Sequence, residues 1–458
     1  MRLNPGQQQA VEFVTGPCLV LAGAGSGKTR VITNKIAHLI RGCGYQARHI
    51  AAVTFTNKAA REMKERVGQT LGRKEARGLM ISTFHTLGLD IIKREYAALG
   101  MKSNFSLFDD TDQVALLKEL TEGLIEDDKV LLQQLISTIS NWKNDLMTPA
   151  QAAAIAKGER DRIFAHCYGL YDAHMKACNV LDFDDLILLP TLLLQRNEEV
   201  RERWQNKIRY LLVDEYQDTN TSQYELVKLL VGQRARFTVV GDDDQSIYGF
   251  RGAKPDVCRM FTQIYKDAEI FRLNMNYRCC ETIVNASLSL INHNKNRFYK
   301  NLKAFNKGGN SVEYYNFNDI SKQDDFVTGY VYNKIYNDTS SDSDESIAIL
   351  TRTNAEASEF TRKLQKHGLN ILYCGNQSDF FDKWVVKDVI AYLRISVGDY
   401  RRQNFIRIIN KPQRYISRMY FTDENTGFNT LEDNIRCRGS KENLEEIIKL
   451  QCHVKNMN

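Results

Sequence analysis

The eight residues AGAGSGKT, at positions 22–29, constrain the fold of this 458-residue chain more than any other segment. They follow a short apolar run, CLVLA, and precede KTRVITNKIAHLI, whose apolar residues recur at helical spacing. A glycine-rich turn between a strand and a helix is the context of a phosphate-binding loop. Glycine lets backbone N–H groups turn toward a triphosphate, and the helix adds its positive amino-terminal end. The segment therefore predicts a site for ATP.

Two side chains of this loop have predicted roles of their own. Lys28 can reach the terminal phosphates of ATP, and Thr29 can bind Mg²⁺ through its hydroxyl group. Alanine stands at position 22, where glycine is usual in this spacing. The loop residues predicted to bind the nucleotide are Ala22, Gly23, Ala24, Gly25, Ser26, Gly27, Lys28 and Thr29.

A pair of carboxylates follows the apolar run in LLVDEYQD, residues 211–218. Open α/β sheets bind ligands at the carboxyl ends of their strands, so we expect both side chains in the nucleotide site. Asp214 would hold Mg²⁺, and Glu215 would orient and deprotonate the attacking water. The alternative interpretation is a solvated acidic turn, which carries less weight beside a phosphate loop.

The segment GDDDQSIYGFRGA, residues 241–253, combines three aspartates with aromatic side chains and an arginine. It follows another apolar run, so Gln245 should lie at the same sheet edge and sense the γ-phosphate of ATP. Tyr248, Phe250 and Arg251 come next, and aromatic rings of this kind stack on the bases of a single strand. The segment would then connect an ATP sensor to a platform for bases. Core packing of Tyr248 and Phe250 is an equally weighted alternative.

The order of apolar runs predicts an α/β fold, because strand-like and helical patterns alternate and favour a parallel sheet covered by helices. Residues from about 88 to 198 look mostly helical, and we interpret them as an insertion. A further region begins near residue 268, with strands expected at 345–352 and 369–375. The strand-like runs of the first sheet are residues 18–22, 50–55, 209–215 and 236–242.

The bulk composition narrows the class of protein only slightly. A net charge of +6 is compatible with a polyanionic partner but does not require one. The ten cysteines show no metal-like CxxC spacing, which favours a reducing compartment. The amino terminus is polar, and the longest apolar run, LILLPTLLL, is too short to span a bilayer. We therefore expect a cytoplasmic protein without a membrane segment.

Together these segments resemble the superfamily 1A DNA helicases of the Rep, UvrD and PcrA type. The likeness is closest up to about residue 257 and weaker beyond residue 278. The motifs that carry it are LNPGQ (3–7), AGAGSGKTR (22–30), TFTNKAAREM (54–63), STFHTLG (82–88), LDFDDLI (181–187), VDEYQDTN (213–220), GDDDQSIYGFRGA (241–253) and NYR (276–278).

The resemblance implies a RecA-like P-loop NTPase sheet with a helical insertion, followed by an incomplete second RecA-like lobe and the start of a second helical insertion. The first RecA-like domain would comprise residues 1–88 and 199–276, with the helical insertion at 89–198. The second lobe would occupy residues 277–375, and the second insertion would occupy residues 376–458.

The resemblance also implies roles around the nucleotide. Gln7 would bond the adenine edge, and Arg30 and Tyr277 would sandwich the adenine ring. Arg278 would act as an arginine finger on the γ-phosphate. With these additions, the expected catalytic residues are Lys28, Asp214, Glu215, Gln245 and Arg278.

The family likeness further implies a track for single-stranded DNA. Phenylalanine at 250 stands where the family usually has tryptophan. A satisfied loop histidine is an equally good interpretation of His85, and Phe183 could belong to the core. The expected DNA-binding residues are Phe55, Asn57, His85, Phe183, Tyr248, Phe250, Arg251 and Asn354.

The activity implied is ATP-dependent 3′–5′ translocation on single-stranded DNA and unwinding at junctions with duplex, in DNA replication or repair. Partners would include replication or repair proteins, and the chain would be a monomer or self-associate on DNA. The family's last two motifs, a TLHSAKGLE-like run and a VTRA-like run, are not found in the sequence. We therefore expect a fragment or a natural truncation, and the alternative function is an ATP- and DNA-binding module without efficient motor activity.

Overall fold

The computed structural model describes residues 2–121, 124, 129–254, 256–336, 346–373, 384–417, 420 and 427–455. The chain divides into two compact units, Met1–Glu313 and Tyr314–Asn458. In the parts of the chain that the structure describes, every helix is too short or too polar to cross a lipid bilayer.

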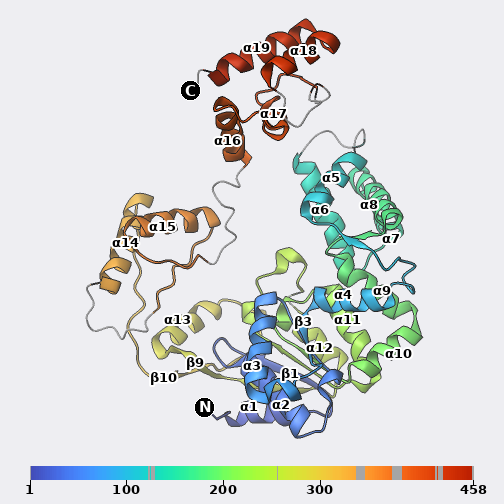
Figure 1. Cartoon of the computed structure of the whole chain (residues 1–458). Helices are drawn as coiled ribbons and strands as arrows, with labels where there is room; N and C mark the ends of the chain where they lie inside the picture. Colours follow the sequence, from blue (N-terminus) through green and yellow to red (C-terminus); the bar gives the residue numbers. More distant parts are fainter. Residues whose placement is uncertain are drawn as a thin grey trace. The chain divides into compact units, whose positions relative to one another are not determined.

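The first unit is built on a six-stranded sheet in the order β3–β2–β6–β7–β1–β8, and each neighbouring pair in it is parallel. Figure 1 shows this sheet among the helices of the first unit. The central strands are buried along their length because helices cover both faces. The α/β fold predicted from the sequence is therefore confirmed. The strands are β1 (Pro17–Ala22), β2 (Ile50–Thr54), β3 (Met80–Thr83), β6 (Tyr210–Val213), β7 (Phe237–Gly241) and β8 (Glu269–Leu273).

Alternate residues of β1 enter two different cores. Leu19 and Leu21 pack on one face of the sheet, whereas Cys18 and Val20 pack on the other. This follows from the two-residue period of a strand. Helices α1 (Pro5–Glu12), α2 (Lys28–Arg41) and α3 (Asn57–Glu75) cover the second face. The first face is covered by α4 (Phe84–Glu95), α9 (Asp185–Arg196), α10 (Glu198–Lys207), α11 (Thr221–Val231) and α12 (Val257–Ile264).

The helical insertion has a core of its own, which includes Leu135, Ile139 and Tyr171. Its elements are β4 (Ser106–Leu107), α5 (Asp110–Leu120), α6 (Lys129–Asn144), α7 (Pro149–Ile155), α8 (Glu159–Cys178) and β5 (Val180–Leu181). The apolar run LILLPTLLL forms most of α9 and is largely buried, as expected for a core segment.

The chain leaves the sheet after β8 and turns back along the phosphate loop. This segment contains β9 (Met275–Cys280), α13 (Glu281–Ile291) and β10 (Lys303–Asn306), and β9 pairs with β10 in parallel. The N–H of Tyr277 donates to the Gly25 carbonyl oxygen at 3.0 Å. Residues 277–313 therefore lie in the same compact unit as the first sheet.

The described elements of the second unit are helices. Val331, Leu364 and Leu369 form one small core, and a larger core gathers side chains between Ala391 and Val454. The helices are α14 (Ile320–Tyr336), α15 (Asn354–Lys366), α16 (Trp384–Ser396), α17 (Arg402–Ile408), α18 (Phe428–Arg438) and α19 (Lys441–Lys455).

The strands predicted at 345–352 and 369–375 are not strands where the structure describes them, at 346–352 and 369–373. A strand needs a neighbour to pair its backbone groups, and within the described residues neither segment has one. Two of their apolar side chains are open, with Leu350 94% and Leu372 87% exposed, whereas Leu369 packs into the small core described above. Residues 345, 374 and 375 lie outside the described part of the chain.

Candidate nucleotide and nucleic-acid site

The phosphate loop joins the end of β1 at Ala22 to the start of α2 at Lys28. Gly25 and Gly27 have φ values of 66° and 86°, a backbone region that strongly favours glycine. A Cβ on Gly25 would lie 2.7 Å from Asn276 Oδ1 and 2.8 Å from Arg278 Cβ. Two independent requirements, the turn and the close approach of β9, therefore call for glycine at position 25.

The carboxylate pair lies at the carboxyl end of β6, beside the loop. Lys28 Nζ and Glu215 Oε2 are 3.1 Å apart and form an ion pair. Asp214 is buried, and its N–H donates to the Val53 carbonyl oxygen at 2.8 Å. The predicted catalytic lysine and glutamate thus contact each other.

The pKa of Asp214 is raised to about 7, chiefly by burial and then by the charge of Glu215, with Lys28 partly opposing the shift. A buried carboxylate of this kind is stabilised by a cation. The Asp214 carboxylate and the Thr29 hydroxyl are hard oxygen donors, which suit Mg²⁺. No group of three or more His, Cys, Asp and Glu side chains could hold a metal within the described residues.

We expect binding of Mg²⁺–ATP to weaken as the pH falls below about 7. Below the pKa of Asp214 the free protein carries a proton that the metal must displace. The affinity should then fall by up to about tenfold per pH unit, and it should level off above pH 7. Titration of a fluorescent ATP analogue with Mg²⁺ between pH 5.5 and 8.5 measures this. A flat profile for the wild type, or the same slope in Asp214→Asn, would contradict it.

Gln217 connects the two loops that follow β6 and β7. Its Nε2 donates to Glu215 Oε2 at 2.9 Å, and its Oε1 accepts from the N–H of Asp242 at 2.9 Å. In the short helix η4 (Asp243–Gln245), Gln245 Nε2 donates to Asp242 Oδ2 at 2.6 Å. Gln245 therefore lies at the same sheet edge as the carboxylate pair.

The three aspartates are neutralised by basic side chains from a distant segment. Lys300 Nζ bonds to Asp242, lies 2.5 Å from Asp243 Oδ1 and lies 2.9 Å from Asp244 Oδ2. Arg297 donates to both carboxylate oxygens of Asp244, from Nε at 2.7 Å and from Nη2 at 2.6 Å. The acidic run is therefore half of a buried ion-pair cluster. The sequence did not predict a role for Lys300 or Arg297, because no local pattern indicates their partners, which lie more than 50 residues away.

The pKa values in this cluster follow its charges. Burial would lower the pKa of Lys300, but the aspartates outweigh burial and raise it. Burial would raise the pKa of Asp244, but Arg297 and Lys300 outweigh it and lower that pKa. Both directions mean that the ionised form is favoured, so the opposite charges of the cluster stabilise one another.

The residues expected near adenine lie beside the loop. Gln7 Nε2 donates to the Ser26 carbonyl oxygen at 2.9 Å, and Gln7 Oε1 accepts from the N–H of Asn4 at 3.0 Å. Asn4 Nδ2 in turn donates to the hydroxyl oxygen of Tyr277 at 2.8 Å. Arg30 lies in the first turn of α2. The structure thus connects Gln7 and Tyr277 through Asn4.

Asn276 is a further residue that the sequence did not single out. Its Nδ2 donates to the Ala24 carbonyl oxygen at 2.8 Å, and its Oδ1 accepts from the N–H groups of Arg278 and Cys279, each at 2.8 Å. The Arg278 side chain is exposed. Asn276 therefore fixes the backbone of the expected arginine finger against the phosphate loop, and its place in the NYR motif was the available signal.

Aromatic side chains follow β2 and β7 at the same edge. The rings of Phe55 and Tyr248 lie 4.7 Å apart, and those of Tyr248 and Phe250 lie 5.9 Å apart. Phe250 is 79% exposed, so the core interpretation is wrong for this residue, whereas Tyr248 is partly buried. An exposed ring beside two others is a surface on which bases can stack.

A second aromatic pair, His85 and Phe183, has ring centroids 5.8 Å apart. Phe183 is 58% exposed and therefore is not a core residue. Asp182, just before Phe183, and Asp185, two residues after it, are buried and each lies 2.7 Å from Lys143 Nζ, whereas the Phe183 ring between them faces outward. Burial lowers the pKa of His85, which favours a neutral ring.

The other expected DNA-binding residues lie in different places. Asn57 is the exposed first residue of α3, and Asn354 is the exposed first residue of α15 in the second unit. Arg251 belongs to the short helix η5 (Gly249–Arg251), and its side chain lies outside the described part of the structure.

The fold and the arrangement at this edge define a RecA-like P-loop protein. The family model described as "UvrD/REP helicase N-terminal domain" matches residues 3–266, and the model of the UvrD-like helicase C-terminal domain matches residues 271–426. The chain belongs to the UvrD/REP helicase family. Both predictions, the RecA-like fold and membership of this family, are confirmed.

Curated relatives agree with this assignment. The chain is 70% identical to ATP-dependent DNA helicase Rep of Salmonella typhimurium and 69% identical to that of Escherichia coli, over 91% of the chain and 61% of either relative. It is 40% identical to ATP-dependent DNA helicase PcrA of Bacillus subtilis, over 90% of the chain and 55% of the relative. The chain thus spans about three fifths of the length of the Rep relatives that it matches.

Proposed function

We propose that this chain is an ATP-dependent 3′–5′ DNA helicase and single-stranded DNA translocase that acts in DNA replication or repair. The observation that carries the proposal is the segment after β7. There Gln245, at the nucleotide edge, is three residues from Tyr248, which belongs to the exposed aromatic surface. Rep and PcrA relatives, each described as an ATP-dependent DNA helicase, support the same activity.

When nucleotide binds, Lys28 would first exchange its ion-pair partner. In the structure Lys28 pairs with Glu215, and a bound triphosphate would draw the ammonium group onto its phosphates. Glu215 would then be free to accept a proton from the attacking water. Mg²⁺, held by Thr29 and Asp214, would supply positive charge for the phosphate oxygens. Hydrolysis would thereby depend on correct nucleotide binding.

Arg278 and Gln245 would report the γ-phosphate to the rest of the protein. Arg278 would neutralise charge on the transferring phosphoryl group, as arginine fingers do. Loss of the γ-phosphate would remove the contacts of both side chains, and the two lobes would relax. Gln7, Arg30 and Tyr277 would hold adenine.

Single-stranded DNA would lie along the carboxyl edge of the sheet. Phe55, Tyr248 and Phe250 form one stacking surface, and His85 with Phe183 forms another. Stacking on aromatic faces tolerates any base, as a translocase requires. Asn57, Arg251 and Asn354 would add polar contacts to the strand.

The wider proposal keeps the four domains expected from the sequence, which are residues 1–88 with 199–276, 89–198, 277–375 and 376–458. It adds junctions of single- and double-stranded DNA as substrates. Replication or repair proteins would be its partners in the cytoplasm, and the chain would act as a monomer or self-associate on DNA. The named relatives give no support to the alternative of a binding module without motor activity.

Stimulation of ATP hydrolysis by single-stranded DNA tests this function. We expect the hydrolysis rate of the 458-residue chain to rise when an oligothymidylate is added. Binding of both nucleotide and DNA with negligible hydrolysis would favour the module instead. Absence of DNA binding would refute both hypotheses.

Phe250→Ala should weaken the affinity for a short oligothymidylate by about 5- to 150-fold, since one stacked base contributes about 1–3 kcal/mol. The ring is exposed, so the fold should not change. Fluorescence anisotropy measures the affinity. Leu290→Ala, at an exposed apolar position in α13, is the control and should have no effect. An equal affinity for Phe250→Ala and wild type would remove Phe250 from the DNA track.

A further inference from the structure

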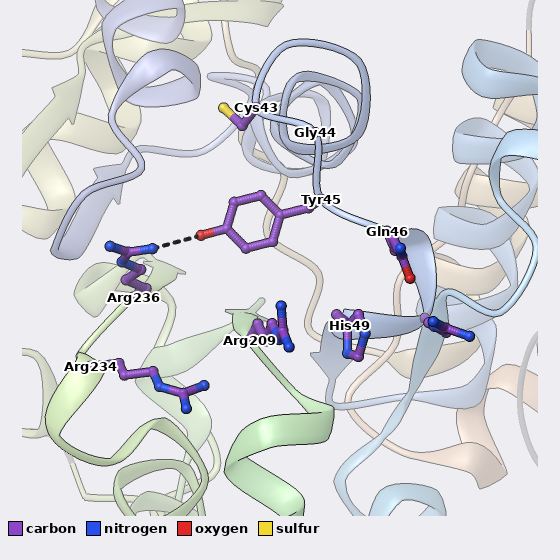
Figure 2. A pocket seen from close by; sticks show the side chains of 9 residues that line it. Cys43, Gly44, Tyr45, Gln46, His49, Arg209, Arg234 and Arg236 are labelled. Atoms are coloured by element: carbon purple, nitrogen blue, oxygen red, sulfur yellow. Dashed lines mark hydrogen bonds between the residues drawn. The ribbon is translucent and has the colours of Figure 1, made fainter.

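A basic pocket lies at the amino-terminal edge of the sheet. In a parallel sheet this edge is opposite the carboxyl ends, where the nucleotide site was found. The pocket has a volume of about 810 Å³, and Figure 2 shows its side chains around one open space. Its lining consists of Cys43, Gly44, Tyr45, Gln46, Arg48, His49, Arg209, Arg234 and Arg236.

The fold brings these residues together from separate segments. His49 immediately precedes β2, Arg209 precedes β6 and Arg236 precedes β7, and these three strands are consecutive in the sheet. The N–H of Arg209 donates to the His49 carbonyl oxygen at 2.8 Å, which continues the pairing of β2 with β6. The row of basic side chains therefore follows from strand order.

Carboxylates do not neutralise the pocket. Its lining contains four arginines and no aspartate or glutamate. Arg236 Nη1 donates to the Tyr45 hydroxyl oxygen at 3.4 Å (Figure 2). Arg234 Nη2 donates to Asn206 Oδ1 at 2.6 Å. Neither acceptor is charged. Within the described residues the guanidinium groups of Arg48 and Arg209 have no hydrogen-bond or ion-pair partner.

Several arginines elsewhere in this unit have carboxylate partners. Arg41 pairs with Glu75 at 2.8 Å, and Arg66 lies 3.9 Å from Glu62. Clustering of uncompensated guanidinium groups raises their mutual repulsion, and an anion relieves it. Arginine forks match the geometry of phosphate oxygens. The chemistry of this lining thus selects a phosphate-bearing ligand.

The width of the site favours a chain of phosphates over one. Neighbouring strands lie about 4.8 Å apart, so the row from β2 to β7 extends about 10 Å. A single phosphate would leave part of this row uncompensated. We propose that the pocket binds the sugar–phosphate backbone of a nucleic acid, at a second site remote from the single-strand track.

This second site goes beyond the proposed motor function and does not depend on Gln245 or on hydrolysis. A strand that fills the track has to be longer before it can also reach the opposite edge. The site should therefore affect the binding of long polynucleotides and not of short ones. Its loss should also reduce the dependence of affinity on salt, because fewer phosphates are neutralised.

The double variant Arg209→Gln with Arg236→Gln tests the proposal. The probes are an oligothymidylate of about eight nucleotides, within the usual range for one binding site, and one of about sixty nucleotides. Loss of about two phosphate contacts should weaken binding of the long strand at least about tenfold near 0.1 M salt and lower the magnitude of the salt slope by about 1.4. Binding of the short strand should be unchanged, which also shows that the variant is folded.

Arg41→Gln with Arg66→Gln is the matched control. It removes the same net charge from exposed, ion-paired positions, and it should leave the binding of both strands unchanged. An equal loss of long-strand affinity in the control would show that the effect comes from net charge alone, and it would overturn the proposal. Unaltered binding of the long strand by the pocket variant would also overturn it. So would pocket-dependent binding of inorganic pyrophosphate without any effect on the long strand, because the ligand would then be a small anion.

Discussion

Glu215→Gln should lower the rate of ATP hydrolysis by about 10²–10⁴-fold and leave nucleotide binding largely intact. The amide has nearly the same shape but cannot accept the proton of the attacking water. Glu215 is well placed for that role, because its carboxylate lies 3.1 Å from Lys28 and 2.9 Å from Gln217 Nε2. Single-turnover hydrolysis and the dissociation constant of a fluorescent ATP analogue separate the two effects.

The control for this experiment is Glu225→Gln. Glu225 pairs with Lys228 on the surface of α11, away from the loop, so hydrolysis should stay at the wild-type rate. A Glu215→Gln protein that hydrolyses ATP within twofold of wild type would exclude Glu215 as the base. A large loss of nucleotide affinity in the variant would show that the ion pair with Lys28 shapes the binding site itself.

Lys300→Met should destabilise the first unit by about 3–5 kcal/mol, the usual cost of removing one partner from a buried charge cluster. Lys300 is 4% exposed and bonds to all three aspartates, so methionine would leave buried carboxylates without their main counter-ion. The free energy of unfolding from urea titration measures the loss. Adding Asp243→Asn should recover part of it, because one uncompensated charge disappears.

Lys307→Met provides the comparison for Lys300. Lys307 pairs with Glu281 at 3.3 Å, but its side chain is 77% exposed, and solvent screens such pairs, so their loss should change the stability little. Similar small losses for the two lysine variants would contradict the role given to Lys300. The cluster also holds Asp242, the partner of Gln245, so Lys300→Met should weaken the response of DNA binding to nucleotide.

Local motifs made the nucleotide site predictable from the sequence. The phosphate loop is contiguous, and a parallel sheet brings the residues after β1, β6 and β7 to one edge. The exposure of Phe183 and Phe250 could not be predicted, because an aromatic residue in an apolar neighbourhood fits a core equally well. It is set by the buried pairing of Asp182 and Asp185 with Lys143 and by the short helix η5.

Contacts between distant segments escaped prediction for a physical reason. Lys300 lies in an irregular stretch after α13, where no periodic pattern indicates burial, and two strands and two α-helices separate it from its partners. The arginine pocket likewise depends on strand order. The apolar runs at 345–352 and 369–375 predicted strands from side-chain pattern alone, although a strand also requires a neighbour with which to pair.

The central claim is that a nucleotide at the phosphate loop changes the grip on single-stranded DNA through Gln245. The most direct measurement is the affinity for a short oligothymidylate with and without a non-hydrolysable ATP analogue, in wild type and Gln245→Ala. We predict that the analogue changes the wild-type affinity several-fold and leaves that of the variant unchanged, although the variant still binds nucleotide. An equal change in both proteins would contradict the claim.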